Sequence, residues 1–107
     1  MDNVRMVKGE IVHTKVKEFW SATALQAECG TNGYHGGDGG HGSRTYIMIS
    51  DIGGTDISIK AYKPDIVFGN GYLIIELTGD SELHTIIDCF RFIAETLEKQ
   101  AKEISLT

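Results

Sequence analysis

The sequence predicts an α+β fold: an antiparallel sheet of five or six strands with one long C-terminal helix packed on one face. Two patterns predict it. Short alternating apolar segments separated by glycine-containing turns run to residue 78, and a continuous helical stripe then covers residues 80–104. The chain has 107 residues, of which 41% are hydrophobic, so residues 1–107 are expected to form a single domain around one modest core.

The first part of the predicted sheet is weakly patterned. Residues 4–13 are apolar and β-branched enough for one strand, with a kink or bulge at Gly9. Residues 15–27 are the next candidate strand. Lys15, Lys17 and Phe19 share one of its faces, and neither face is cleanly apolar. The pattern therefore leaves open which side of this strand meets the core.

The second part of the predicted sheet is patterned more sharply. Residues 45–51 and 56–62 alternate on either side of Gly53-Gly54, which predicts a β-hairpin. After a turn around Pro64, residues 66–68 begin another strand. The Asn70-Gly71 pair favours a type I′ turn into residues 72–78. The sequence therefore predicts two consecutive hairpins.

The C-terminal helix has both a start signal and a long apolar stripe. Asp80 or Ser81 can cap the first amides, and Glu82 places an acid in the positive first turn. Apolar residues then recur at three- and four-residue steps, which predicts one face packed on the sheet. The stripe comprises Leu83, Ile86, Ile87, Phe90, Ile93, Ala94, Leu97, Ala101 and Ile104.

One helix covers one face of a sheet of this size, so the other face needs cover. Small domains often complete their burial by association, and the sequence therefore predicts a homo-oligomer. The residues expected at contacts between subunits are apolar side chains outside the main stripe and strand faces: Tyr46, Met48, Tyr62, Cys89 and Phe92.

Composition excludes several classes of protein. The formal net charge of −5 argues against a nonspecific nucleic-acid binder, whose affinity comes from Lys and Arg. No apolar run reaches the roughly 20 residues of a membrane span, and the first residues lack the basic start of a signal peptide. A cytoplasmic protein with Cys29 and Cys89 as free thiols is therefore expected, and neither cysteine has the close second cysteine of a structural zinc site.

The most informative feature is a glycine-rich loop over residues 30–44, in which seven glycines fall between Gly30 and Gly42. Glycine allows bare amides to approach a ligand, and successive inward N–H groups form an anion-binding nest. This interpretation predicts a site for a phosphorylated or nucleotide-derived small molecule, with Arg44 as a charged donor. The predicted ligand-binding residues are Tyr34, His35, Gly37, Asp38, Gly39, Gly40, His41, Gly42, Ser43 and Arg44.

Two other interpretations of the loop stay open. His35, Asp38 and His41, at three-residue steps, are proper ligands for a divalent metal, to which His13 or His84 would add a fourth. Alternatively, the segment is a surface loop that holds no ligand. The loop is neither a Walker A motif nor a Rossmann fingerprint, so no cofactor is expected. A nucleophile motif such as Gly-x-Ser-x-Gly is also missing, which favours a binding protein over an enzyme.

The most distinctive segment of the chain is Gly36-Gly37-Asp38-Gly39-Gly40-His41-Gly42-Ser43-Arg44-Thr45. In size and general plan, the chain resembles small phage- or prophage-encoded anti-defence proteins that sequester nucleotide immune signals. The resemblance implies an oligomer in the host cytoplasm that holds its ligand without turnover. The alternative class is a protein-interaction module that inhibits a host enzyme through its acidic surface.

Overall fold

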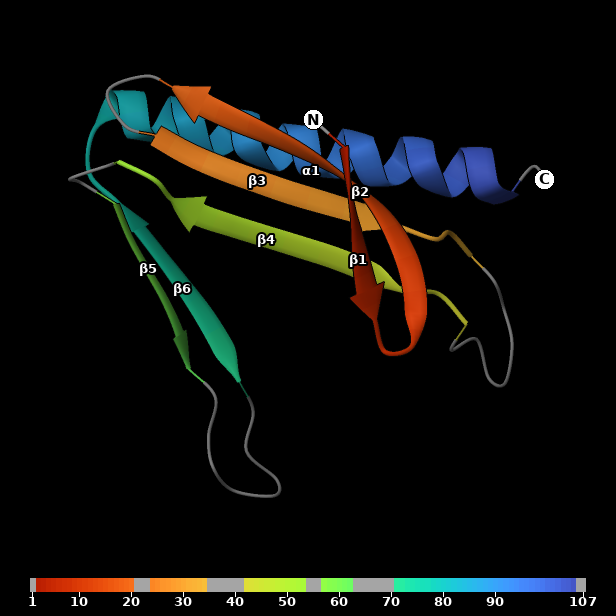
Figure 1. The fold of residues 1–107 in the computed structure, drawn as a ribbon. Helices are drawn as coiled ribbons and strands as arrows, with labels where there is room; N and C mark the ends of the chain where they lie inside the picture. Colours follow the sequence, from red (N-terminus) through yellow and green to blue (C-terminus); the bar gives the residue numbers. More distant parts are fainter. Residues whose placement is uncertain (1, 21–23, 35–41, 54–56, 63–70, 106–107) are drawn as a thin grey trace.

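A computed structural model describes residues 2–20, 24–34, 42–53, 57–62 and 71–105. Within these residues the chain has the predicted α+β fold, with strands followed by one long helix (Figure 1). The elements are β1 (Asp2–Val7), β2 (Glu10–Trp20), β3 (Ala24–Thr31), β4 (Thr45–Asp51), β5 (Ile57–Tyr62), β6 (Tyr72–Leu77) and α1 (Asp80–Ser105). The strands form a four-stranded sheet in the order β1-β2-β3-β4 and a separate pair, β5-β6.

The four-stranded sheet is an antiparallel meander whose first turn the sequence prediction missed. Lys8 and Gly9 connect β1 to β2 with φ values of 45° and 86°. Positive φ at both central residues is typical of a two-residue type I′ turn. The prediction of one strand over residues 4–13 is therefore wrong, because the chain reverses at Gly9. The predicted strand over residues 15–27 is likewise divided between β2 and β3.

A charged network joins β1 to strands that are not its neighbours. The guanidinium of Arg5 donates to both carboxylate oxygens of Glu28, at 2.6 and 2.7 Å, and lies 5.2 Å from the centre of the Tyr46 ring. The Thr14 hydroxyl donates to the same carboxylate at 2.7 Å. Because β1 pairs with β2 alone among the described strands, contacts from β1 to β3 and β4 require the sheet to curl. The curled face, opposite the helix, buries Glu28 to 2% exposure.

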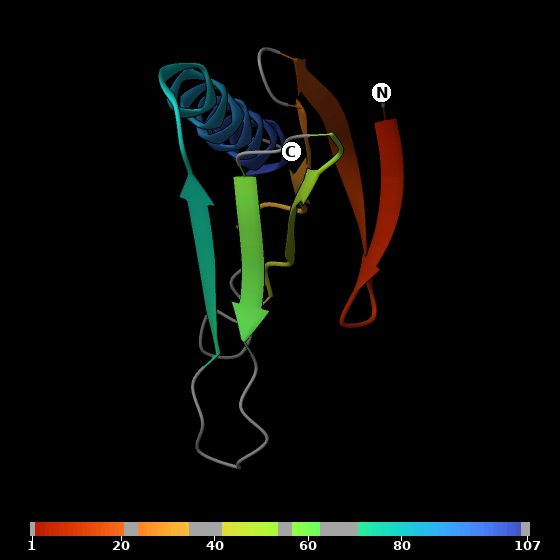
Figure 2. The ribbon, with the colours of Figure 1, turned by 90° about the vertical axis from the view of Figure 1, so that its left-hand side faces the viewer.

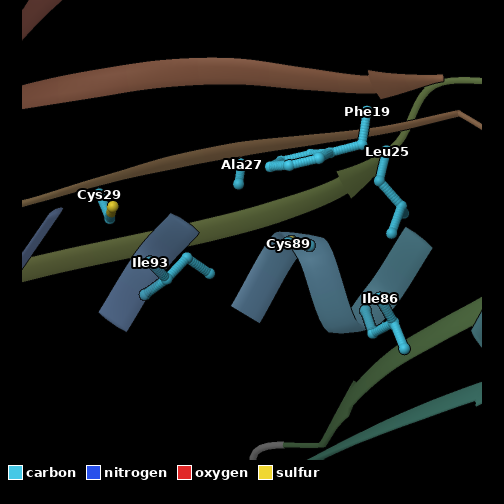
Figure 3. Packing of buried hydrophobic residues seen from close by; sticks show 7 residues of the cluster. All are labelled: Phe19, Leu25, Ala27, Cys29, Ile86, Cys89 and Ile93. Atoms are coloured by element: carbon cyan, nitrogen blue, oxygen red, sulfur yellow. The ribbon is translucent and has the colours of Figure 1, made fainter. Parts of the chain in front are cut away.

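Helix α1 packs on the other face of this sheet, mainly over β3. Ile86, Cys89 and Ile93 of the helix meet the side chains of Phe19, Leu25, Ala27 and Cys29 in the main core (Figure 3). Gln100 fixes the far half of the helix: its Oε1 accepts the Thr31 N–H at 2.8 Å, and its Nε2 donates to the His13 carbonyl at 3.1 Å. In the described part of the chain, no helix is long and apolar enough to cross a membrane.

The start of α1 also differs in detail from the prediction. The Gly79 carbonyl accepts the Leu83 N–H at 3.1 Å, so Gly79 occupies the cap position and Asp80 opens the first turn. The φ of Gly79 is 120°, and a Cβ there would meet the Glu82 carboxylate. Glu82, three residues after the cap, is folded back over the helix start, as in a capping box.

The β5-β6 hairpin extends the core beyond the main sheet. Figure 2 shows it below α1, beside the β4 edge of the four-stranded sheet. Ile57, Ile59, Ile75 and Leu77 share one face of the hairpin and pack against the core. The predicted hairpin between residues 45–51 and 56–62 is therefore wrong, because β4 pairs with β3 across the glycine-rich loop. The predicted strand over residues 66–68 lies outside the described residues.

The predicted helix stripe proves to be two rows. Ile86 and Ile93 are buried, whereas Leu83, Ile87 and Phe90 are exposed. A helix on a sheet contacts it along one row, and small side chains on β3 let Cys89 lie in that row. The prediction that Ile87 and Phe90 are core residues is therefore wrong.

Most of the residues that the sequence predicts at subunit contacts instead pack against other residues of the same chain. Cys89 is fully buried, and the Phe92 ring packs edge-on against Phe19 with centroids 5.8 Å apart. Tyr46 lies under Arg5 and donates its hydroxyl to the Met48 sulfur at 3.9 Å. Of the five, Tyr62 is exposed.

Candidate functional site

The glycine-rich loop connects β3 to β4 and is fixed at its base. The Asn32 N–H donates to the Arg44 carbonyl at 3.0 Å, and the Arg44 N–H donates to Asn32 Oδ1 at 2.6 Å. The Thr31 hydroxyl contacts the same Arg44 carbonyl at 3.1 Å and accepts the Gly33 N–H at 3.2 Å. These bonds hold the two ends of the loop together, so a ligand at the loop would not have to bring them together.

The described part of the loop places some of the predicted ligand-binding residues. Tyr34 is 82% exposed, and Ser43 is also exposed. The Arg44 guanidinium extends toward the β1–β2 turn, where its Nε donates to the Lys8 carbonyl at 3.5 Å. Gly42 precedes Ser43 and is half-buried. The other predicted residues lie outside the described residues: His35, Gly37, Asp38, Gly39, Gly40 and His41.

Gly30 belongs to β3 and not to the loop, contrary to the predicted loop boundary. A Cβ at this position would overlap the His13 carbonyl oxygen and lie 2.9 Å from Thr14 Cα. The absence of a side chain here serves close packing of β3 against β2. One of the seven clustered glycines therefore has a structural explanation that needs no ligand.

A small pocket of about 230 Å³ lies beside the base of the loop, against α1. It combines hydroxyls from the loop base with apolar helix side chains and one carboxylate. Hydroxyls and a carboxylate suit hydrogen bonding to a polyol such as ribose, and an exposed tyrosine offers a face for stacking. Tyr34, Ser43, Leu97 and Glu98 supply these groups, and the Thr31 and Thr45 hydroxyls in the same wall bond to each other at 3.0 Å.

The metal interpretation depends on residues beyond the described ranges. Its three central ligands, His35, Asp38 and His41, lie outside them. In the part of the chain that the structure describes, no three His, Cys, Asp or Glu side chains are grouped to hold a metal. Of the two suggested additional ligands, His13 is on β2, and His84 is near the start of α1, 3.3 Å from Asp88.

Both cysteines are buried free thiols, as expected. Burial raises the pKa of the Cys29 thiol and raises that of Cys89 to about 11. A raised pKa keeps the sulfur in its unreactive thiol form at neutral pH, because the thiolate is the nucleophile and metal ligand. The two cysteines therefore serve as small core residues.

The chain matches no protein family, no curated protein and no solved structure.

A second hollow, on the opposite flank of α1, was missed by the sequence reasoning. It brings Lys15 and Lys17 of β2 beside Lys99 of the helix. The sequence does place the two strand lysines on one face, which is a weak signal of local positive charge. Only the packing of α1 on the sheet, however, brings Lys99 to them.

Proposed function

We propose that this protein binds a phosphorylated or nucleotide-derived small molecule at the loop between β3 and β4, without turnover. The observation that carries the proposal is the hydrogen-bonded base formed by Thr31, Asn32 and Arg44. It presents a segment of unusual glycine content from a fixed position beside a pocket of hydroxyl groups. Glycine amides suit the phosphate, and the pocket with Tyr34 suits a sugar and base.

Such a protein would act by sequestration. A ligand that is held and not turned over is withdrawn from solution in proportion to the amount of protein. This is the action of the nucleotide-sequestering anti-defence proteins that the chain resembles. The proposal uses no catalytic residue, and it places the ligand chemistry in backbone amides, hydroxyls and one aromatic ring.

The test is a thermal-shift screen of the whole protein with cyclic dinucleotides, ADP-ribose and divalent metal salts. A ligand that binds only the folded state stabilises it by mass action and so raises Tm. The stabilisation is about 2.7 kcal/mol at a free ligand concentration of a hundred times Kd. A nucleotide that raises Tm supports the proposal. Stabilisation by metal alone, with loss in His35→Ala, Asp38→Ala and His41→Ala, would favour the metal interpretation. No stabilisation by any of them would favour the protein-interaction alternative.

Variants then assign the site. Tyr34→Leu, Ser43→Ala, Arg44→Ala and alanine at Gly37, Gly39, Gly40 or Gly42 are expected to weaken binding and leave the Tm of the free protein nearly unchanged. Tyr62→Leu is the matched control, since Tyr62 is an exposed tyrosine on β5, away from the loop. Full affinity in all the loop variants would refute a loop site.

The proposal includes self-association, carried by the outer row of α1. Leu83, Ile87 and Phe90 are 57%, 43% and 51% exposed and follow the four- and three-residue spacing of a helix-pairing seam. An exposed apolar row of this kind fits a chain that buries further apolar surface against a copy of itself.

Light scattering after size exclusion tests this part. The wild type is expected to have the mass of a dimer or higher oligomer, and Phe90→Ser is expected to lower it. Ile11→Ser, at an exposed apolar residue of β2, is the control and should leave the mass unchanged. A monomeric wild type at high micromolar concentration would refute self-association.

A further inference from the structure

A groove of about 650 Å³ runs between β2 and the C-terminal half of α1. Lys15 and Lys17 are cross-strand partners of Cys29 and Ala27, which face the helix. The two lysines therefore stand on the helix side of the sheet, where α1 no longer covers β2. Lys99 approaches from the helix, so cations from two elements line one groove.

The positive charge of this groove is only partly neutralised within the chain. Lys15 Nζ lies 2.8 Å from Asp2 Oδ1, in a pair exposed to solvent. Lys17 Nζ lies over two aromatic rings, 5.3 Å from the centre of Phe19 and 5.8 Å from that of Phe92. Among the described residues, no carboxylate lies within ion-pair distance of Lys99. In a chain of net charge −5, this arrangement leaves a local excess of positive charge, which favours an anion.

The remaining walls restrict the kind of anion. The partly buried Phe92 ring supplies an apolar surface, and the Glu103 carboxylate would repel a ligand that is anionic along its whole length. The groove has the size of pockets for small molecules, which are typically about 300 to 1,000 Å³. A ligand with a phosphate at one end and an uncharged, partly apolar body fits these features.

We propose that this groove binds a phosphate-bearing small molecule of nucleotide size, with its phosphate held by Lys17 and Lys99 and its apolar body on Phe92. The site is separate from the one at the glycine-rich loop. The two hollows share no lining residue and lie on opposite flanks of α1. Either site can therefore fail without the other.

The experiment is calorimetric titration of the whole protein with ADP and, separately, with inorganic pyrophosphate. Lys17→Gln and Lys99→Gln are each expected to raise Kd for both probes by about tenfold or more, because tenfold is the lower end of the effect of losing one hydrogen bond to a charged group. Lys60→Gln, which removes an exposed lysine of β5, is the control and should leave Kd unchanged. Rising salt should weaken wild-type binding.

Phe92→Leu tests the apolar contact, because leucine keeps the side chain apolar and removes the ring. It should weaken ADP binding and leave pyrophosphate binding unchanged. Equal binding of the two probes, unaffected by Phe92→Leu, would overturn the nucleotide assignment.

Comparison with the loop variants separates the two sites. Binding that survives Lys17→Gln and Lys99→Gln but is lost in Ser43→Ala and Tyr34→Leu would overturn the groove proposal and support the loop. Binding that is lost in the lysine variants and survives in the loop variants would support the groove and overturn the loop site. If neither probe binds at millimolar concentration, the groove proposal fails.

Discussion

Replacing Glu28 by glutamine is expected to destabilise the protein by about 2 to 4 kcal/mol at pH 7. The carboxylate is almost fully buried and receives two hydrogen bonds from Arg5 and one from Thr14. Glutamine keeps the size of the side chain, but its amide group is a donor, which would face the donors of Arg5 or Thr14.

The magnitude follows from the bonds that are lost. A hydrogen bond to a charged group contributes about 1.5 to 3 kcal/mol. The amide oxygen of glutamine can replace Oε2, which accepts from Arg5 Nε and Thr14, but its NH2 group would face the Arg5 Nη2 donor, and the two remaining bonds lose the negative charge of the acceptor. Because the Arg5 side chain is 39% exposed, water can solvate its released donors, which keeps the loss below the sum of the bonds. A domain of this size has a stability of about 5 to 15 kcal/mol, so the variant should still fold.

The same network predicts a dependence on pH. The Arg5 guanidinium holds the pKa of Glu28 below its ordinary value, with a further contribution from the Thr14 hydroxyl, while burial opposes the shift. The folded protein therefore binds fewer protons than the unfolded chain between the two pKa values. The stabilisation is complete above about pH 4.3, the ordinary glutamate value, and is lost as the pH falls through the folded-state pKa.

The assay is urea unfolding of the wild type and Glu28→Gln from pH 7 to pH 3. Glu10→Gln is the matched control, since Glu10 is an exposed glutamate on β2. The free-energy difference between wild type and Glu28→Gln should be constant near neutrality and shrink in acid. Arg5→Met should cost less in the Glu28→Gln background than alone, because the partner is already gone. Equal midpoints for Glu28→Gln and Glu10→Gln, or a gap that stays constant to pH 3, would refute the reasoning.

Three further variants test the core, a close contact and a turn. Ile93→Ala should lower the free energy of unfolding by about 2 to 5 kcal/mol through lost burial and a cavity, whereas Ile87→Ala, at an exposed position, should lower it by about 1 kcal/mol or less in the monomer. Similar urea midpoints for both variants would contradict the two-row description of α1. Gly30→Ala should lower Tm strongly, whereas Gly53→Ala, where a Cβ has its nearest neighbour at 3.6 Å, should be tolerated; equal thermal shifts would show that β2 and β3 are not so close. Lys8→Asn should raise the free energy of unfolding by about 0.5 to 1 kcal/mol, because asparagine accepts positive φ more readily than lysine. A denaturation midpoint below that of the wild type would argue against the type I′ turn.

Local chemistry in the sequence predicts the α+β class and the long helix. The helix spans 26 residues with an apolar recurrence and an acidic first turn, and such signals act within a few residues of one another. The same holds for the later alternating segments that become β4, β5 and β6. The positions of these elements therefore follow from the order of the residues alone.

Partner choice between the strands is a long-range property, and the sequence did not determine it. The alternation of residues 45–51 fits either of two neighbours, and the packing of Ile49 against the core with β3 decides between them. The Lys8-Gly9 turn was missed for a different reason, because lysine is an unusual residue at positive φ.

The two candidate sites also differ in how much of each the sequence predicts. Composition alone singles out the glycine-rich loop, and tertiary structure adds that its ends are clamped and that Gly30 lies in a strand. The lysine groove exists only because α1 crosses β3 and leaves β2 open, which brings Lys99 to Lys17 from a distant part of the chain. The sequence determines which chemical groups are available. The packing of the helix on the sheet decides which of them meet, because residues far apart in the chain come together only when apolar surface is buried between their elements.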